Sequence, residues 1–236
     1  MHIPDGYISP QTCAVMYAAA APFWYVAGRK IKETLTARTV PMLSLLSAFT
    51  FTIMMFNIPL PGGTTAHAVG AVLAAIVLGP WAAVLTTSVA LVIQALLFGD
   101  GGVTAIGANA FNMAVAMPLV GYAVYRLVSA NAPITSRRHV WGAALGGYVG
   151  INVAALLTGL ELGIQPLLFT AADGTPLYSP FSLAQAIPAM MIGHLTVGGL
   201  AEGAIAALIV AYLQRTNLPL LQLRPRMKEE VASWAS

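Results

Sequence analysis

Apolar residues occur in long, nearly uninterrupted runs along the whole chain, and Gly, Pro or charged residues bound each run. Runs of about 20 apolar residues are long enough to cross the roughly 30 Å of bilayer hydrocarbon as helices. We therefore predict an all-α integral membrane protein built as one bundle of seven transmembrane helices. The predicted helices are Ile8–Gly28, Met42–Phe56, Thr64–Gly79, Trp81–Phe98, Ile106–Val128, Val140–Leu160 and Leu183–Leu213.

The third run, Thr64–Gly79, is short, and a run of this length also suits a re-entrant or buried segment. The distribution of charge favours a crossing helix. If residues 64–98 formed one kinked helix, Arg137 and Arg138 would lie on the opposite side of the membrane from the other basic residues. We therefore expect the third run to cross, with Gly79-Pro80 as a tight cytoplasmic turn.

Seven crossings that start outside place every Lys and Arg on the inner face, as the positive-inside rule requires. The outer face then carries only acidic charge, from Asp5, Asp100, Glu161 and Asp173. We predict an outer amino terminus and a cytoplasmic carboxyl terminus. The eleven inner residues are Arg29, Lys30, Lys32, Arg38, Arg126, Arg137, Arg138, Arg215, Arg224, Arg226 and Lys228.

Composition supports this assignment, because 58% of the residues are hydrophobic and only 8% are charged, whereas soluble domains carry roughly 25% charged residues. We expect one membrane domain over residues 1–213 and a short cytoplasmic tail over residues 214–236. The basic residues flank apolar runs and form no single patch, so we predict no nucleic-acid partner. The amino terminus has no basic leader before an apolar core, so we expect Met1 to be retained.

Two of the four histidines, His2 and His67, fall at the predicted outer face. A histidine at position 2 can chelate a metal through the amine of Met1, its own deprotonated amide nitrogen and its imidazole Nδ1. An imidazole from His67 would complete four nitrogens, and a tetragonal nitrogen set is typical of Ni(II) or Cu(II), with low-spin Co(II) a further candidate. The alternatives are a frayed terminus and a hydrogen-bonded histidine at the start of a helix.

Local features favour the chelate over a disordered terminus. A bulky residue at position 2 protects the initiator Met from removal, Pro4 stiffens the chain, and Asp5-Gly6 is a turn pair that can fold the terminus back onto the bundle. The amine titrates near about 8 and the imidazole near about 6.5, so binding should weaken as the external pH falls.

Polar residues inside the predicted helices are further candidates, since ionisable groups within a membrane are commonly functional. His194 and Glu202 lie eight residues apart on roughly one helix face, where they would relay protons or pin helices together. Asn109 and Asn112 would support His67 as second-layer residues or form helix–helix hydrogen bonds. The other polar residues at this depth are Gln94 and Asn152.

The sequence lacks the GxxxxGK[ST] pattern of a P-loop, so we expect no ATP binding through such a loop and an energy source elsewhere. It also lacks a nucleophile–base set or a cofactor fingerprint, which argues against a membrane enzyme. We therefore predict a transporter subunit that is not an enzyme and has no organic cofactor.

Four motifs resemble the CbiM/NikM family of substrate-specific components of energy-coupling-factor transporters for cobalt or nickel. They are Met1-His-Ile-Pro-Asp-Gly-Tyr, Pro61-Gly-Gly-Thr-Thr-Ala-His67, Phe98-Gly-Asp-Gly-Gly and Gly107-Ala-Asn-Ala-Phe-Asn112. The resemblance implies a seven-helix bundle in a prokaryotic cell membrane, with the amino-terminal segment inserted into the outer mouth. It also implies that Met1, His2 and His67 bind Ni(II) or Co(II), the transported substrate.

The resemblance further implies partner proteins: a transmembrane coupling protein, two cytoplasmic ABC ATPases and a small accessory membrane protein. Together they would form an ATP-driven importer that captures the metal outside and releases it inside. The alternative is a proton-coupled divalent metal carrier that acts alone through His194 and Glu202. The sequence leaves nickel and cobalt open, because both suit the same nitrogen ligands.

Overall fold

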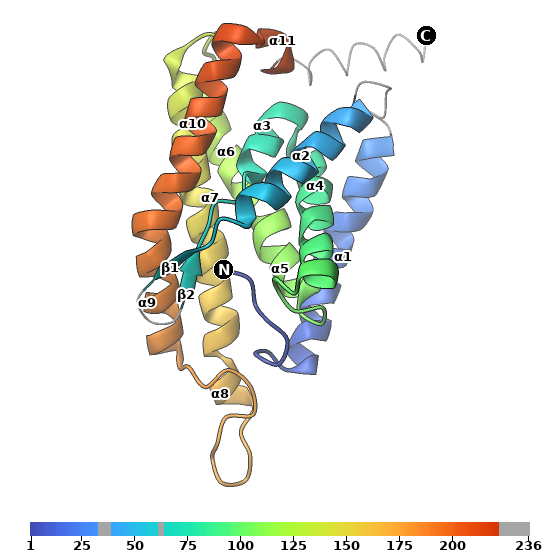
Figure 1. Ribbon diagram of the computed structural model, residues 1–236, viewed down its shortest axis with the longest axis vertical. Coiled ribbons are helices and arrows are strands. Elements are labelled where there is room, and N and C mark those ends of the chain that lie inside the picture. Colours follow the sequence, from blue (N-terminus) through green and yellow to red (C-terminus); the bar gives the residue numbers. More distant parts are fainter. Residues whose placement is uncertain (33–38, 61–63, 222–236) are drawn as a thin grey trace.

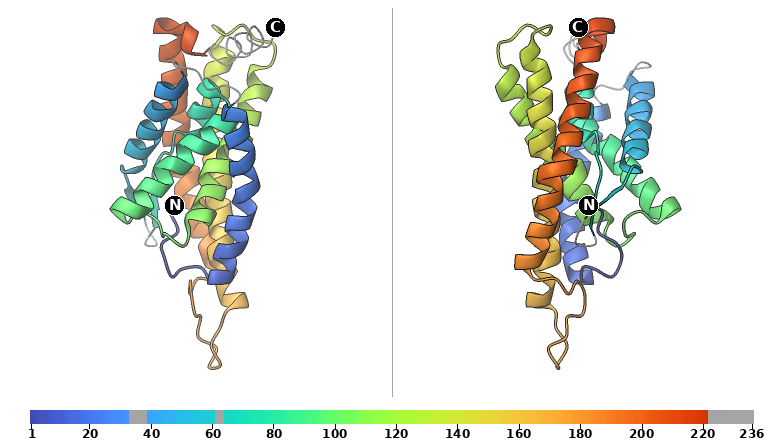
Figure 2. Two further views of the ribbon diagram at one scale, coloured as in Figure 1. Left: turned by 90° about the vertical axis from the view of Figure 1, so that its right-hand side faces the viewer. Right: turned by 60° about the vertical axis from the view of Figure 1, so that its left-hand side comes forward.

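The structure is a computed structural model that describes residues 1–32, 39–60 and 64–221, and it is largely a bundle of helices (Figures 1 and 2). Arg38, Arg224, Arg226, Lys228 and Pro61-Gly62-Gly63, all used in the sequence predictions, lie outside the described residues. The helices are α1 (Pro10–Lys32), α2 (Thr39–Met54), α3 (Ala71–Leu78), α4 (Pro80–Ile93), α5 (Ile106–Asn109), α6 (Met117–Ser129), α7 (Arg137–Gly163), α8 (Gln165–Leu168), α9 (Leu183–Gly193), α10 (Gly199–Thr216) and α11 (Leu218–Leu221). Three π-helical segments, η1 (Gln94–Phe98), η2 (Ala110–Ala116) and η3 (His194–Gly198), and two strands, β1 (Ile58–Leu60) and β2 (Thr64–Ala66), complete the described elements.

Four continuous helical stretches in the described residues are long and apolar enough to cross a membrane. They are Pro80–Phe98, Ile106–Ser129, Arg137–Leu168 and Leu183–Thr216, and Thr39–Met54 is a shorter apolar helix. The prediction of a mostly helical chain with membrane-spanning helices is confirmed, whereas the count of seven crossing helices is not.

The third predicted helix, Thr64–Gly79, differs most from the expectation. Its first residues form β2, which pairs antiparallel with β1 and places Ile58 opposite Ala66. Only Ala71–Leu78 is helical, and eight residues at 1.5 Å each give a helix about 12 Å long. Such a helix is too short to cross the hydrocarbon alone, but every one of its residues is buried in the bundle.

The predicted turn at Gly79-Pro80 is present between α3 and α4. Gly79 has a φ of 97°, a conformation that favours glycine, and Pro80 occupies the first turn of α4. The charge pattern therefore identified a real reversal of the chain, although the helix before it is shorter than predicted.

Apart from the buried Glu202, the described charged residues lie toward opposite ends of the bundle. Lys and Arg side chains lie in the last turns of α1, α6 and α10 and the first turn of α7, which meet at the end that we call the basic end. The acidic residues Asp5, Asp100, Glu161 and Asp173 belong to segments at the other end, where α1 begins and α7 finishes, which we call the acidic end. The chain begins near mid-height among the helices and then runs to the acidic end, where α1 begins (Figure 1).

Candidate metal site

The first nine residues precede α1 and connect the interior of the bundle, where Met1 lies, to the acidic end, where α1 begins. The side chain of Ile3 is fully buried, and Met1 is only 5% exposed. The Met1 amine lies 3.4 Å from the carbonyl oxygen of Thr65, just before His67. The terminus is therefore packed inside the protein beside the β2–α3 connection.

Hydrogen bonds hold this segment from both sides. The backbone N–H of Ile3 donates to Asn109 Oδ1 at 2.8 Å, and Asn109 Nδ2 donates back to the Ile3 carbonyl at 3.1 Å. The same carbonyl accepts the N–H of Gly102 at 2.8 Å. Asn109 thus fixes the backbone one residue after His2.

The loop after η1 is shaped to receive the segment. The Asp5 carboxylate accepts the N–H groups of Val103 at 3.0 Å and Thr104 at 2.8 Å, and it also accepts the Thr104 hydroxyl. A Cβ atom on Gly102 would lie 2.4 Å from the Asp5 nitrogen, so only glycine permits this approach. The Asp5-Gly6 pair and the Phe98-Gly-Asp-Gly-Gly motif therefore dock against each other.

The imidazoles of His2 and His67 stack on one another inside the bundle. Their ring centroids are 4.9 Å apart and their planes differ by 20°. His67 is 1% exposed, and its Nδ1 lies 3.1 Å from the carbonyl oxygen of Ala68. Because a carbonyl oxygen only accepts hydrogen bonds, Nδ1 carries the proton, and the unpartnered, buried Nε2 keeps its lone pair.

The imidazole of His2 is placed differently from the predicted chelate. Its Nδ1 lies 3.3 Å from Asp100 Oδ1, and its buried Nε2 has no hydrogen-bond partner. The carboxylate lies within reach of a proton on Nδ1. Chelation through Nδ1 therefore requires the ring to rotate away from Asp100.

Burial favours the neutral forms of the nitrogens at this site. It lowers the pKa of the Met1 amine to about 6, although the nearby Asp100 carboxylate acts in the opposite direction. Burial and, less strongly, the positive charge of the amine lower the pKa of His2 to about 3. The Gln94 side chain has a weaker effect that raises this pKa. The pKa of His67 falls well below its ordinary value for the same leading reason. Neutral nitrogens have free lone pairs, which metal binding requires.

A cavity of about 570 Å³ reaches Met1 and His2 from the side of α9. Thr65, Phe181 and Gln185 are among the residues that line it. The cavity therefore joins the first two residues to the start of α9 and to Leu162 near the end of α7.

The structure brings Asn109 to the amino-terminal segment but gives Asn112 other partners. Asn112 Nδ2 donates to Thr158 Oγ1 at 3.2 Å and to Glu161 Oε2 at 2.9 Å, and both partners belong to α7. Asn112 therefore joins η2 to α7, as the alternative of helix–helix hydrogen bonding predicts.

His194 and Glu202 have separate partners, so no hydrogen bond between them is present in the described chain. His194 Nδ1 lies 2.7 Å from the Met190 carbonyl oxygen. The Glu202 carboxylate accepts the backbone N–H groups of Val69 and Gly70. A direct relay between the two side chains is not formed in this conformation.

Two contributors near the site were not assigned to it from the sequence. Asp100 was noted only as an outer acidic residue, yet it contacts the His2 imidazole. Gln94 was noted only as a polar residue within a helix, yet it acts to raise the pKa of His2. The signal for Asp100 was its position between the glycines of the Phe98-Gly-Asp-Gly-Gly motif. No group of three or more His, Cys, Asp or Glu side chains able to hold a metal occurs among residues 1–32, 39–60 and 64–221.

A family model described as the cobalt uptake substrate-specific transmembrane region, CbiM, matches residues 2–220. The chain belongs to the CbiM family. The predicted resemblance is thus confirmed over almost the whole chain, and relatives named as nickel and cobalt transport proteins support the membrane assignment.

Relatives of this CbiM-family chain include proteins named for nickel and for metal transport. It is 57% identical to the fused nickel transport protein NikMN of Rhodobacter capsulatus over 95% of this chain and 65% of that protein. It is 44% identical to the putative metal transport protein MJ1569 of Methanocaldococcus jannaschii over 92% of this chain and 93% of that protein. A crystal structure described as a transition metal transporter matches with a TM-score of 0.87 and 56% identity over 96% of this chain and 99% of that chain. This CbiM-family chain therefore spans about two thirds of the fused nickel transport protein.

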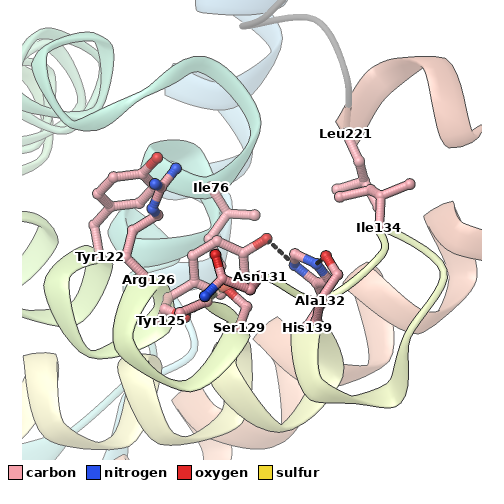
Figure 3. A pocket seen from close by; sticks show the side chains of 11 residues that line it. Ile76, Tyr122, Tyr125, Arg126, Ser129, Asn131, Ala132, Ile134, His139 and Leu221 are labelled. Carbon is pink, nitrogen blue, oxygen red and sulfur yellow. Dashed lines mark hydrogen bonds between the residues drawn. The ribbon is translucent and has the colours of Figure 1, made fainter.

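A second cavity, of about 630 Å³, lies at the basic end of the CbiM-family fold. Figure 3 shows the Tyr125 hydroxyl pointing at the His139 ring, with Arg126 and Leu221 also lining the space. The hydroxyl lies 2.7 Å from His139 Nδ1, and His139 Nε2 lies 3.2 Å from the Ala132 carbonyl. Both nitrogens of His139 are thus engaged, unlike those of His2 and His67.

Proposed function

We propose that the chain is the metal-capturing membrane subunit of an ATP-driven importer of the energy-coupling-factor type. It binds Ni(II) or Co(II) at the outer face through the Met1 amine, the His2 amide nitrogen and imidazole, and the His67 imidazole. The observation that carries the proposal is that the buried Met1 amine lies with the stacked imidazoles of His2 and His67 inside the bundle, where His67 Nε2 is unpartnered.

The donor chemistry supports these two metals. Amine, amide and imidazole nitrogens form a tetragonal set, and copper, nickel and cobalt are the divalent ions that such a set suits. Relatives named as nickel and cobalt transport proteins favour the last two ions over copper. Asn109 supports the site by holding the backbone of Ile3, next to His2. Asp100 contacts His2 Nδ1 in this conformation, and metal binding through Nδ1 replaces that contact.

The proposal that the chain is an importer subunit also specifies its orientation in the membrane and its partner proteins. The separation of charges in the bundle is consistent with an outer acidic end and a cytoplasmic basic end. The sequence lacks a P-loop pattern, so ATP hydrolysis is assigned to two cytoplasmic ABC ATPases acting through a transmembrane coupling protein, with a small accessory membrane protein as a further component.

Metal uptake by reconstituted vesicles tests the proposal. The chain is reconstituted alone, with a pH gradient, and separately with the coupling protein and the ATPases. Nickel uptake that requires both partners and ATP supports the proposal. Uptake by the chain alone that follows the pH gradient would establish the proton-coupled carrier instead.

A further inference from the structure

Glu202 is a buried carboxylate that the proposed metal site does not use directly. It is 1% exposed and lies in the first turn of α10. Glu202 Oε2 accepts the N–H of Val69 at 2.7 Å, and the Gly70 N–H points to both carboxylate oxygens at 3.0 and 3.1 Å. Backbone amides only donate, so an ionised carboxylate matches all of these contacts.

The two amides lie between His67 and helix α3. Gly70 precedes the helix with a φ of 76°, and no side chain from its own position caps the helix. A carboxylate here is favoured by the positive end of the helix dipole. Glu202 therefore fixes the backbone two and three residues after His67.

One peptide group connects this carboxylate to the imidazole. The Val69 N–H that Glu202 accepts and the Ala68 carbonyl that faces His67 Nδ1 belong to the same planar peptide unit. The hydrogen bonds therefore run from the imidazole through the Ala68–Val69 peptide to the carboxylate. Successive hydrogen bonds in a buried site polarise and strengthen one another.

We propose that Glu202 is a positioning residue that acts on His67 through the Ala68–Val69 peptide group. It holds the imidazole in one orientation, keeps the proton on Nδ1 and makes Nε2 a better metal donor. Carboxylates that bond directly to metal-binding histidines have the same effect, and here a peptide group stands between the two. This inference rests on the proposed function, because it takes His67 as a ligand.

A double-mutant cycle tests the inference by measuring the dissociation constant of Ni(II) for the purified chain. Glu202→Gln places an amide NH₂ against a backbone donor, and we expect affinity to fall about 10- to 100-fold. His67→Ala removes the residue through which Glu202 acts. In the double variant, Glu202→Gln should therefore add no further loss.

Glu161→Gln is the matched control. Glu161 is also a buried carboxylate, at 7% exposure, but it accepts a hydrogen bond from Asn112 Nδ2 instead of from the His67 loop. We expect its nickel affinity to equal that of the unmodified chain. An equal loss from Glu202→Gln with and without His67, or no loss at all, would overturn the inference.

Nitrogen NMR of the ring-labelled chain provides a second readout that does not depend on the folding of Glu202→Gln. His67 should be a neutral imidazole with its proton on Nδ1, identified by the signal that His67→Ala removes. The opposite tautomer would contradict the inference. An unmodified chain that does not bind nickel would instead contradict the proposed function, so the two failures are distinct.

Discussion

The basic end of the bundle and the region around the buried amino terminus both hold buried histidines, but the ring nitrogens have different partners in the two regions. At the basic end, both nitrogens of His139 face partners, Tyr125 and Ala132. Near the amino terminus, His2 and His67 each leave Nε2 buried and unpartnered. An unsatisfied buried polar group costs about 1–3 kcal/mol, so it indicates a role that outweighs this cost. His194 also leaves Nε2 buried and unpartnered, but only His2 and His67 stack on one another beside the Met1 amine. We therefore interpret His139 as structural and propose His2 and His67 as ligands.

The largest expected effect comes from adding one residue before Met1. The extension converts the amine into an amide and requires space where Met1 is buried. We expect nickel affinity to fall at least about 1,000-fold, which corresponds to about 4 kcal/mol. Calorimetric titration of the extended and native chains measures the change, and equal affinities would exclude the amine as a ligand.

Replacement of His67 should have a smaller effect, because three nitrogens of the chelate remain. We expect His67→Ala to weaken nickel binding about 100-fold, or about 2.7 kcal/mol. The visible absorption of the bound nickel should also change, since one nitrogen donor is replaced. An unchanged spectrum and affinity would place His67 outside the coordination sphere.

Asn109 and Asn112 lie three residues apart, and replacing each in turn distinguishes support of the metal site from helix packing. Asn109→Ala removes both hydrogen bonds to Ile3, so we expect about tenfold weaker nickel binding. Asn112→Ala removes contacts with α7 and should lower thermal stability more than nickel affinity. A larger affinity loss from Asn112→Ala would reverse this assignment.

The pH dependence of binding should change slope near pH 6. Above this pH the Met1 amine is already neutral, because burial lowers its pKa to about 6, and nickel displaces only the His2 amide proton. Below it the amine proton must also leave, so affinity should fall more steeply. A change of slope near pH 8, the ordinary value for an exposed amine, would show that the terminus is solvated.

Tyr125→Phe tests the other member of the comparison and should have the smallest effect on affinity. It removes the 2.7 Å hydrogen bond to His139, so we expect about 1 kcal/mol less stability. Nickel affinity should be unchanged. A loss of affinity would show that the basic end also contributes to metal binding.

The helical regions were largely predictable, because long apolar runs bounded by charge leave the chain few alternatives in a bilayer. The exception, residues 64–79, was misassigned since an apolar run of that length does not distinguish a crossing helix from a strand followed by a short buried helix. Its composition is apolar in either case. Only the contacts with β1 and the surrounding helices decide between them.

Met1 and His2 could be proposed as ligands from the sequence because they are adjacent in it, and the structure places His2 against His67. The role of Asn109 was anticipated only in part, because its bonds to Ile3 join residues 106 positions apart. The contact of Asp100 with His2 and that of Glu202 with the His67 loop likewise depend on tertiary packing. Sequence spacing grouped Glu202 with His194, whereas the fold joins it to Val69 and Gly70.

X-ray absorption at the nickel edge, on the chain with its native Met1, tests the central claim most directly. The account predicts one nickel per chain, bound by four nitrogens, with scattering from two imidazole rings. Six oxygen or nitrogen donors with no more than one imidazole would contradict it, because such a site cannot be formed by Met1, His2 and His67 together.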